Sequence, residues 1–235
     1  MIAVDILRTL PLFAALDAEQ LRFIAACASV QRLPRGTMVL AINSQVPAKT
    51  LKEFIDYAKA NPGKLNYGSP GSGSVGHLVA ALFVARAGID IMHVPYKGGG
   101  PAMTDLLGGQ IPMLFGNSGE VMSNAKNDRI RIIAVSTAQR MKQLPNTPAV
   151  SELLPGFEMT AWQGTLAPAR TPRAVIDVIA NAIMALSKEA NTIERLNEIG
   201  VESTTTTPEQ MSAIIRGEQG VYAEAVKAAG LMRPQ

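Results

Sequence analysis

Hydrophobic and polar positions alternate in blocks along most of the chain. Short apolar runs of strand length are followed by longer segments in which apolar residues recur at helical spacing. From residue 38 onward this order repeats, which predicts an α/β fold with a largely parallel sheet. The expected strands are 38–42, 64–68, 91–94, 111–115, 131–135, 163–167 and 201–204, and the expected helices are 48–60, 71–87, 101–107, 119–125, 172–186, 192–199 and 208–229.

The first 36 residues do not show this regular alternation of strand and helix patterns. Apolar spacing predicts a short amphipathic helix around residues 16–25, and a strand end and a turn follow at 30–36. Helix starts are marked elsewhere by Thr50 and by Thr207, the second of which is followed by proline. We therefore expect the regular α/β alternation to begin only after residue 36.

Composition narrows the function classes. The 235 residues are 47% hydrophobic and 17% charged, which is typical of a globular protein. The net charge of +3 is small and spread out, and aromatic residues are only 5%, so we expect no nucleic-acid partner. Cys27 is the single cysteine, and the two histidines are His77 and His93, so we expect no disulfide framework, no metal site and no cofactor.

No apolar run reaches the roughly 18–20 residues that span a bilayer. The short apolar stretch at 10–16 contains Pro11 and has charged neighbours, unlike a secretory signal. From the residues alone we expect a cytoplasmic location if the chain is made as written.

The most informative stretch is a glycine-rich turn between an expected strand and an expected helix. Residues 71–76 read GSGSVG, which matches the G-x-G-x-x-G of dinucleotide-binding sites. However, the preceding strand is short and polar, Pro70 follows it, and Asp90 stands before the next strand rather than at its end. A nucleotide-dependent enzyme is therefore the weakest of the functions considered.

Two interpretations of this turn remain open. In one, the serines only satisfy the N-terminus of the following helix. In the other, the N–H groups of residues 71–74 and the serine hydroxyls bind an anion such as a carboxylate, helped by the helix dipole.

Two further strand-to-helix turns are rich in donors. Residues 94–102 read VPYKGGGPA, and residues 116–118 read GNS. Lys97 is either a solvated loop lysine or a ligand contact. Turns at the carboxyl ends of adjacent strands line the crevice where α/β sheets bind ligands. Because no catalytic nucleophile, no paired general base and no metal-binding cluster accompanies these turns, they favour a binding protein over an enzyme.

Several longer strings resemble the solute-binding proteins of tripartite tricarboxylate transporters, the Bug family. The strings are VPAKTLKEF (46–54), ANPGKLNYGS (60–69), HVPYKG (93–98), TDLLGGQ (104–110), LPNTP (144–148), WQGTLAP (162–168) and VKAAG (226–230). The resemblance implies a periplasmic, type II-like binding protein of two α/β lobes that closes over a small carboxylate and delivers it to a membrane permease. The ligand-binding positions that it implies are Ser69, Gly71, Ser72, Gly73, Ser74, His77, Lys97 and Asn117.

The resemblance covers residues 37–235 and implies that most of the first lobe is missing. Residues 1–36 resemble instead the start of a cyclic-nucleotide-binding domain, without its phosphate-binding residues. We therefore expect three segments: 1–36 as a graft, 37–160 as the second lobe, and 161–235 returning to the first lobe.

The function expected is thus a non-enzymatic carboxylate receptor impaired by truncation, and the alternative is a cyclic-nucleotide-type regulatory module. Surfaces that the missing lobe covers, such as those of the last two helices, are expected to be apolar and exposed. That exposure predicts self-association or poor solubility. It also predicts carboxylate binding no better than millimolar, or about 4 kcal/mol.

Overall fold

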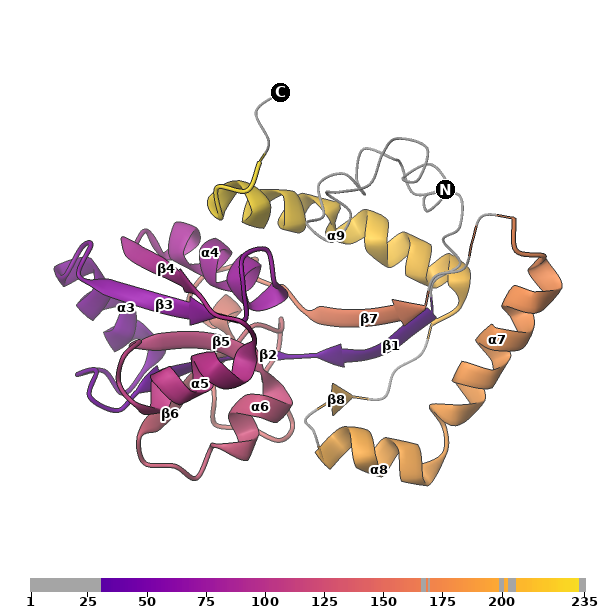
Figure 1. Cartoon of the computed structure of the whole chain (residues 1–235), viewed down its shortest axis with the longest axis horizontal. Coiled ribbons are helices and arrows are strands. Elements are labelled where there is room, and N and C mark those ends of the chain that lie inside the picture. The colour runs from indigo at the N-terminus through magenta and orange to yellow at the C-terminus, as the bar shows by residue number, and fades with distance from the viewer. Residues whose placement is uncertain (1–30, 166–167, 169, 199–200, 203–205, 233–235) are drawn as a thin grey trace. The chain divides into compact units, whose positions relative to one another are not determined.

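The structure is a computed structural model that describes residues 31–165, 168, 170–198, 201–202 and 206–232. The chain forms two compact units, of which the larger comprises residues 36–161 and 224–231 and the smaller comprises 1–35, 162–223 and 232–235. The helix expected at 16–25 lies outside the described residues. Figure 1 labels the elements of both units.

The larger unit is built on a five-stranded sheet in the order β4-β3-β5-β2-β6. The strands are β2 (Met38–Asn43), β3 (Leu65–Ser69), β4 (Ile91–Pro95), β5 (Met113–Asn117) and β6 (Ile130–Val135). Strand β3 pairs in parallel with β4 and with β5, as expected. Strand β2 is the exception in this largely parallel sheet, because it runs antiparallel to both β5 and β6.

Helices cover both faces of this sheet (Figure 1). They are α3 (Leu51–Ala60), α4 (Val75–Ala87), α5 (Gly99–Leu107) and α6 (Ser118–Ser123). Every residue of β2 is buried, because alternate side chains enter the core on each side of the sheet. On one face, α5 and α6 pack through a cluster that includes Val39, Leu106 and Leu114.

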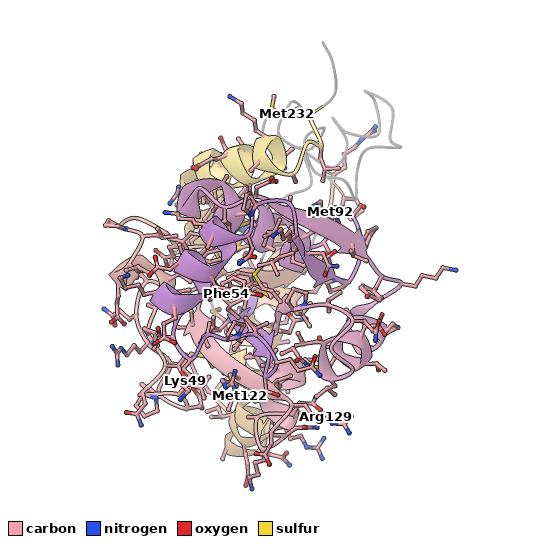
Figure 2. The ribbon with its side chains drawn as sticks, turned by 90° about the vertical axis from the view of Figure 1, so that its left-hand side faces the viewer. Lys49, Phe54, Met92, Met122, Arg129 and Met232 are labelled. Atoms are coloured by element: carbon pink, nitrogen blue, oxygen red, sulfur yellow. The ribbon has the colours of Figure 1, made fainter. Side chains whose placement is uncertain are left out.

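Aromatic side chains fill the opposite core. Phe83 of α4 stacks on Phe54 of α3 with 6.5 Å between ring centroids, and it meets Phe115 of β5 edge-on at 5.7 Å. Phe54 lies in the interior, whereas Lys49 and Arg129 lie at the surface (Figure 2). This packing fixes α4 against the strands that lead into the loops of interest.

Local signals in the sequence account for the helix starts. Thr50 caps α3 by accepting a hydrogen bond from the N–H of Glu53, and Ser74 caps α4 by accepting one from His77. Gly88, in the left-handed conformation, ends α4. These positions agree with the expected helices to within a few residues.

The smaller unit has a three-stranded sheet in the order β7-β1-β8, with β1 (Gln31–Gly36), β7 (Ala161–Thr165) and β8 (Val201–Glu202). Its helices are α7 (Arg173–Leu186), α8 (Ala190–Glu198) and α9 (Pro208–Ala228), and the last residues of α9 belong to the larger unit. Thr207 caps α9 by accepting from Gln210 N–H. The middle strand, β1, comes from the segment for which the sequence predicts a separate graft.

Large exposed apolar side chains gather on α7. Val175, Val178, Ile179 and Leu186 are each at least 40% exposed and recur at helical spacing. The expectation of such surfaces on the last two helices is wrong, because the residues described on α8 and α9 include no large exposed apolar side chain. None of the helices described in the chain has the length and hydropathy of a membrane span.

Candidate functional site

Three strand-to-helix loops lie at the same end of the larger sheet, where its parallel strands have their carboxyl ends; this end is here called the edge of the sheet. Strands β4, β3 and β5 are parallel neighbours, so their carboxyl ends, at Pro95, Ser69 and Asn117, lie on the same side. Each strand leads through a short loop or directly into a helix, namely α5, α4 and α6. The expectation that the three donor-rich turns share one edge is confirmed by this topology.

The loop between β3 and α4, here called the serine–glycine loop (residues 69–74), is held by internal hydrogen bonds. Gly71 N–H donates to Ser69 Oγ (3.2 Å), Gly73 N–H to His77 Nδ1 (3.0 Å) and Ser74 N–H to the Gly71 carbonyl (3.1 Å). Gly73 has a φ of +77°, in the left-handed region that favours glycine. Of the four N–H groups expected to meet an anion, only that of Ser72 has no partner among the described residues.

The three serines of this loop have different roles. Ser69 is fully buried, and Ser74 uses its hydroxyl to cap α4 and to donate to the Gly71 carbonyl at 2.7 Å. Ser72 is exposed, and no hydrogen bond is recorded for it within the described chain. The structural interpretation of the loop thus applies to Ser69 and Ser74, and the anion-binding interpretation applies best to Ser72.

A further unpaired N–H group lies just after the loop, in the first turn of the helix. The N–H of Val75, in the first turn of α4, has no partner among the described residues. Together with the Ser72 N–H and hydroxyl, it gives a small set of donors at the positive end of a 13-residue helix. Such a set suits a carboxylate or another anion.

The second loop is bound directly to the first. Tyr96 N–H donates to the Ser69 carbonyl (2.9 Å), and Gly98 N–H donates to the Pro70 carbonyl (3.1 Å). Burial, and then the hydrogen bond that Tyr96 Oη donates to Asp105 at 2.7 Å, raise the pKa of the tyrosine to about 12. Lys97 is exposed on the loop where a ligand contact was expected, and its side chain makes no hydrogen bond or ion pair with the described residues.

The third loop contributes an exposed Asn117, which precedes α6 and makes no capping hydrogen bond with its side chain. The Glu120 carboxylate lies against Gly99, at the start of α5, so closely that a Cβ there would collide with it. Burial raises the pKa of Glu120 above its usual value. Sequence reasoning missed Glu120, because only the meeting of α5 and α6 reveals it.

His77 is not suited to bind an anion through a positive charge. It is buried, its Nδ1 accepts from Gly73, and its ring stacks on His93 of β4 with 3.6 Å between centroids. Burial, and secondarily His93, lower its pKa to about 4. At neutral pH His77 is therefore an uncharged part of the loop's support rather than a cation for the ligand.

Enzymatic chemistry finds little support in this geometry. Ser69 Oγ lies 2.6 Å from His93 Nε2, which resembles a nucleophile beside a base, but Ser69 is fully buried. Asp90 lies before β4, at the end of the sheet opposite the glycine loop, which argues against a ribose contact. The described part of the chain holds no group of three or more histidine, cysteine or acidic side chains arranged for a metal ion.

The sequence profile described as "Tripartite tricarboxylate transporter family receptor" matches residues 9–231. The chain belongs to this family. The match includes most of the segment 1–36, and no comparison supports a cyclic-nucleotide-binding module.

Individual relatives agree with the family. A Pseudomonas sp. relative, the "UPF0065 protein in tcbD-tcbE intergenic region", is 32% identical over 77% of this chain and 54% of its own length. An R. palustris protein solved with adipate is 29% identical, with a TM-score of 0.78, over 87% of this chain and 68% of that one. The periplasmic binding protein BugD is 25% identical, with a TM-score of 0.81, over 97% and 77%. The chain spans about half the length of most of the curated relatives it matches.

Proposed function

We propose that the chain provides part of the solute-binding receptor of a tripartite tricarboxylate transport system, and that it binds a small carboxylate at the edge formed by β4, β3 and β5. Membership of the receptor family supports the transport role. The observation that carries the location is the serine–glycine loop, where Ser72 and Val75 present unpaired N–H groups at the start of α4.

Carboxylate is the ligand class that this edge fits best. An R. palustris neighbour of similar fold was solved with adipate, a dicarboxylate. The donors here are main-chain N–H groups, a serine hydroxyl, the amide of Asn117 and the ammonium of Lys97. Charge-assisted hydrogen bonds to a carboxylate contribute more than neutral ones, which gives anions the advantage over sugars or amides.

The cellular role follows the family. Receptors of this kind act in the periplasm and pass their solute to membrane permease subunits, and we extend both properties to this chain. The role requires binding and release without chemical change, so we assign no catalytic residue and no cofactor.

The proposal is tested by titrating the chain with adipate and other di- and tricarboxylates in a calorimeter. Because the described donors come from one edge of one sheet, we expect a Kd near millimolar, about 4 kcal/mol. The sharpest variant is Ser72→Asp, which places a negative charge at the donors, with the isosteric, neutral Ser72→Asn as its control.

Ser72 is exposed and makes no recorded hydrogen bond, so both variants keep the fold. We expect Ser72→Asp to abolish adipate binding and Ser72→Asn to leave it within about threefold, a difference of at most ~0.7 kcal/mol. Equal binding by the two variants would show that the carboxylate binds elsewhere.

A further inference from the structure

The serine–glycine loop rests on two stacked histidines that come from different elements. His77 lies on α4 and His93 on β4, with 3.6 Å between ring centroids and 8° between ring planes. Tyr67 of β3 extends the stack at 5.0 Å from His93. His93 Nε2 lies 2.6 Å from Ser69 Oγ at the start of the loop, and His77 Nδ1 accepts from Gly73 N–H near its end.

The bond to Gly73 fixes the protonation state of His77. A backbone N–H can only donate, so Nδ1 of His77 must carry a lone pair, and the ring proton of the neutral form resides on Nε2. A second proton has no site except Nδ1, where it would point at the Gly73 N–H. Protonation of His77 therefore breaks the hydrogen bond that holds Gly73 in place.

Among the described residues, none raises the pKa of His77 and so favours its charged form. Helix α4 packs on β3, β4 and β5; the titratable side chains of these strands are Tyr67 on β3 and His93 on β4, and β5 carries none. Helix α4 also meets α3 through Phe83 and Phe54, and the charged side chains of α3 are exposed, namely Lys52, Glu53, Asp56 and Lys59. Within α4 the other charged residue is Arg86, in its last turn, where it pairs with Glu224. Burial lowers the pKa of both histidines, and two stacked imidazolium rings would also repel each other.

We propose that His77, stacked on His93, is a positioning residue that holds the serine–glycine loop in its ligand-binding conformation only while it is uncharged. This inference rests on the proposed function and deepens it. It assigns the histidine no contact with the ligand. If His77 bound the carboxylate as a cation, acid would strengthen binding. Because His77 supports the loop in its neutral form, acid should release the loop and weaken binding instead.

Two substitutions separate the acceptor from the rest of the side chain. The amide oxygen of His77→Asn lies at the δ position and accepts from Gly73, but it cannot be protonated in this pH range. His77→Gln places its acceptor one atom further out. We expect His77→Asn to keep adipate affinity within about threefold and His77→Gln to weaken it about tenfold or more, 1.4 kcal/mol on the standard conversion.

The pH experiment uses the wild-type chain labelled with ¹⁵N and needs no ligand. The His77 ring signals should show an unprotonated Nδ1 at pH 7, and between pH 7 and pH 4 the Gly73 amide should shift with the same midpoint as the His77 ring. In His77→Asn the Gly73 amide should not titrate over this range.

A Gly73 amide that ignores His77 protonation in the wild-type chain would overturn the inference, even if every variant failed to fold. So would equal loss of adipate affinity in His77→Asn and His77→Gln. A wild-type chain that binds no carboxylate, while Gly73 still follows His77, would overturn the proposed function and with it the role in ligand binding.

Discussion

Two glycines stand at the second position of the helices that follow the first two loops. Substitution by alanine should change the free energy of unfolding in opposite directions at these two positions. Gly76 is the second residue of α4, and Gly100 is the second residue of α5. A Cβ on Gly76 would lie 2.7 Å from the Phe115 carbonyl oxygen and 3.0 Å from Pro70 Cδ. A Cβ on Gly100 would meet nothing within 4 Å.

At Gly76 the cost of the close contact outweighs the higher helix propensity of alanine, so the substitution should destabilise the chain. Alanine gains about 1 kcal/mol over glycine in a helix interior, and less at its first turn. Against this, the carbonyl of buried Phe115 belongs to a central strand and cannot yield, so overpacking costs roughly 1–3 kcal/mol. We expect Gly76→Ala to lower the free energy of unfolding by about 1–2 kcal/mol, the difference between these two effects.

Gly100→Ala serves as the matched control. It removes backbone freedom from the unfolded chain without a clash, so it should raise stability by about 0.4–1 kcal/mol. Urea unfolding followed by circular dichroism measures both variants. If Gly76→Ala stabilised the chain as Gly100→Ala does, α4 would not be pressed against β5, and the support of the serine–glycine loop described above would be wrong.

Three further predictions concern a cap, an ion pair and a surface. Ser74→Ala should cost about 1 kcal/mol of stability through its lost N-cap, whereas Ser72→Ala should cost none and instead weaken adipate binding about tenfold, as calorimetry would show. The Arg140 hydrogen bond, then the Ala149 N–H, hold the pKa of Glu152 at about 2, below its usual 4.5, so its stabilising effect is present above pH 4.5 and is lost as the pH falls toward 2. Glu152→Gln should therefore lower the urea midpoint at pH 7 and have a much smaller effect at pH 2, where about half of the Glu152 carboxylates are already protonated in the folded chain. The exposed apolar residues of α7 predict concentration-dependent association in sedimentation runs, which Val178→Lys should reduce; a monomer at all concentrations would contradict this.

Local features of the fold were predictable from the sequence. Strand and helix positions follow from apolar spacing, and the caps at Thr50 and Ser74 follow from side chains that bind a nearby N–H. The common edge of the three loops also follows, because successive parallel strands end on the same side. The element positions and the caps depend on residues close together in the chain, whereas the common edge follows from the regular order of strands and helices.

Features that depend on distant pairing were not predictable. The direction of β2 is set by β5 and β6, which lie some 70–100 residues further along the chain. The stack of His77 on His93 and the approach of Glu120 to Gly99 arise only when separate elements meet. The sequence indicated a donor-rich loop, but only the structure distinguishes the N–H groups that support the loop from those that remain open.

The most direct test of a carboxylate site at the serine–glycine loop is an NMR titration of the ¹⁵N-labelled chain with adipate at pH 7. We expect that the amide signals of Ser72 and Val75 shift together, that the shifts saturate in the millimolar range, and that Ser72→Asp removes them while Ser72→Asn keeps them. Saturating shifts confined to other residues, or no shifts in any part of the chain, would contradict this expectation.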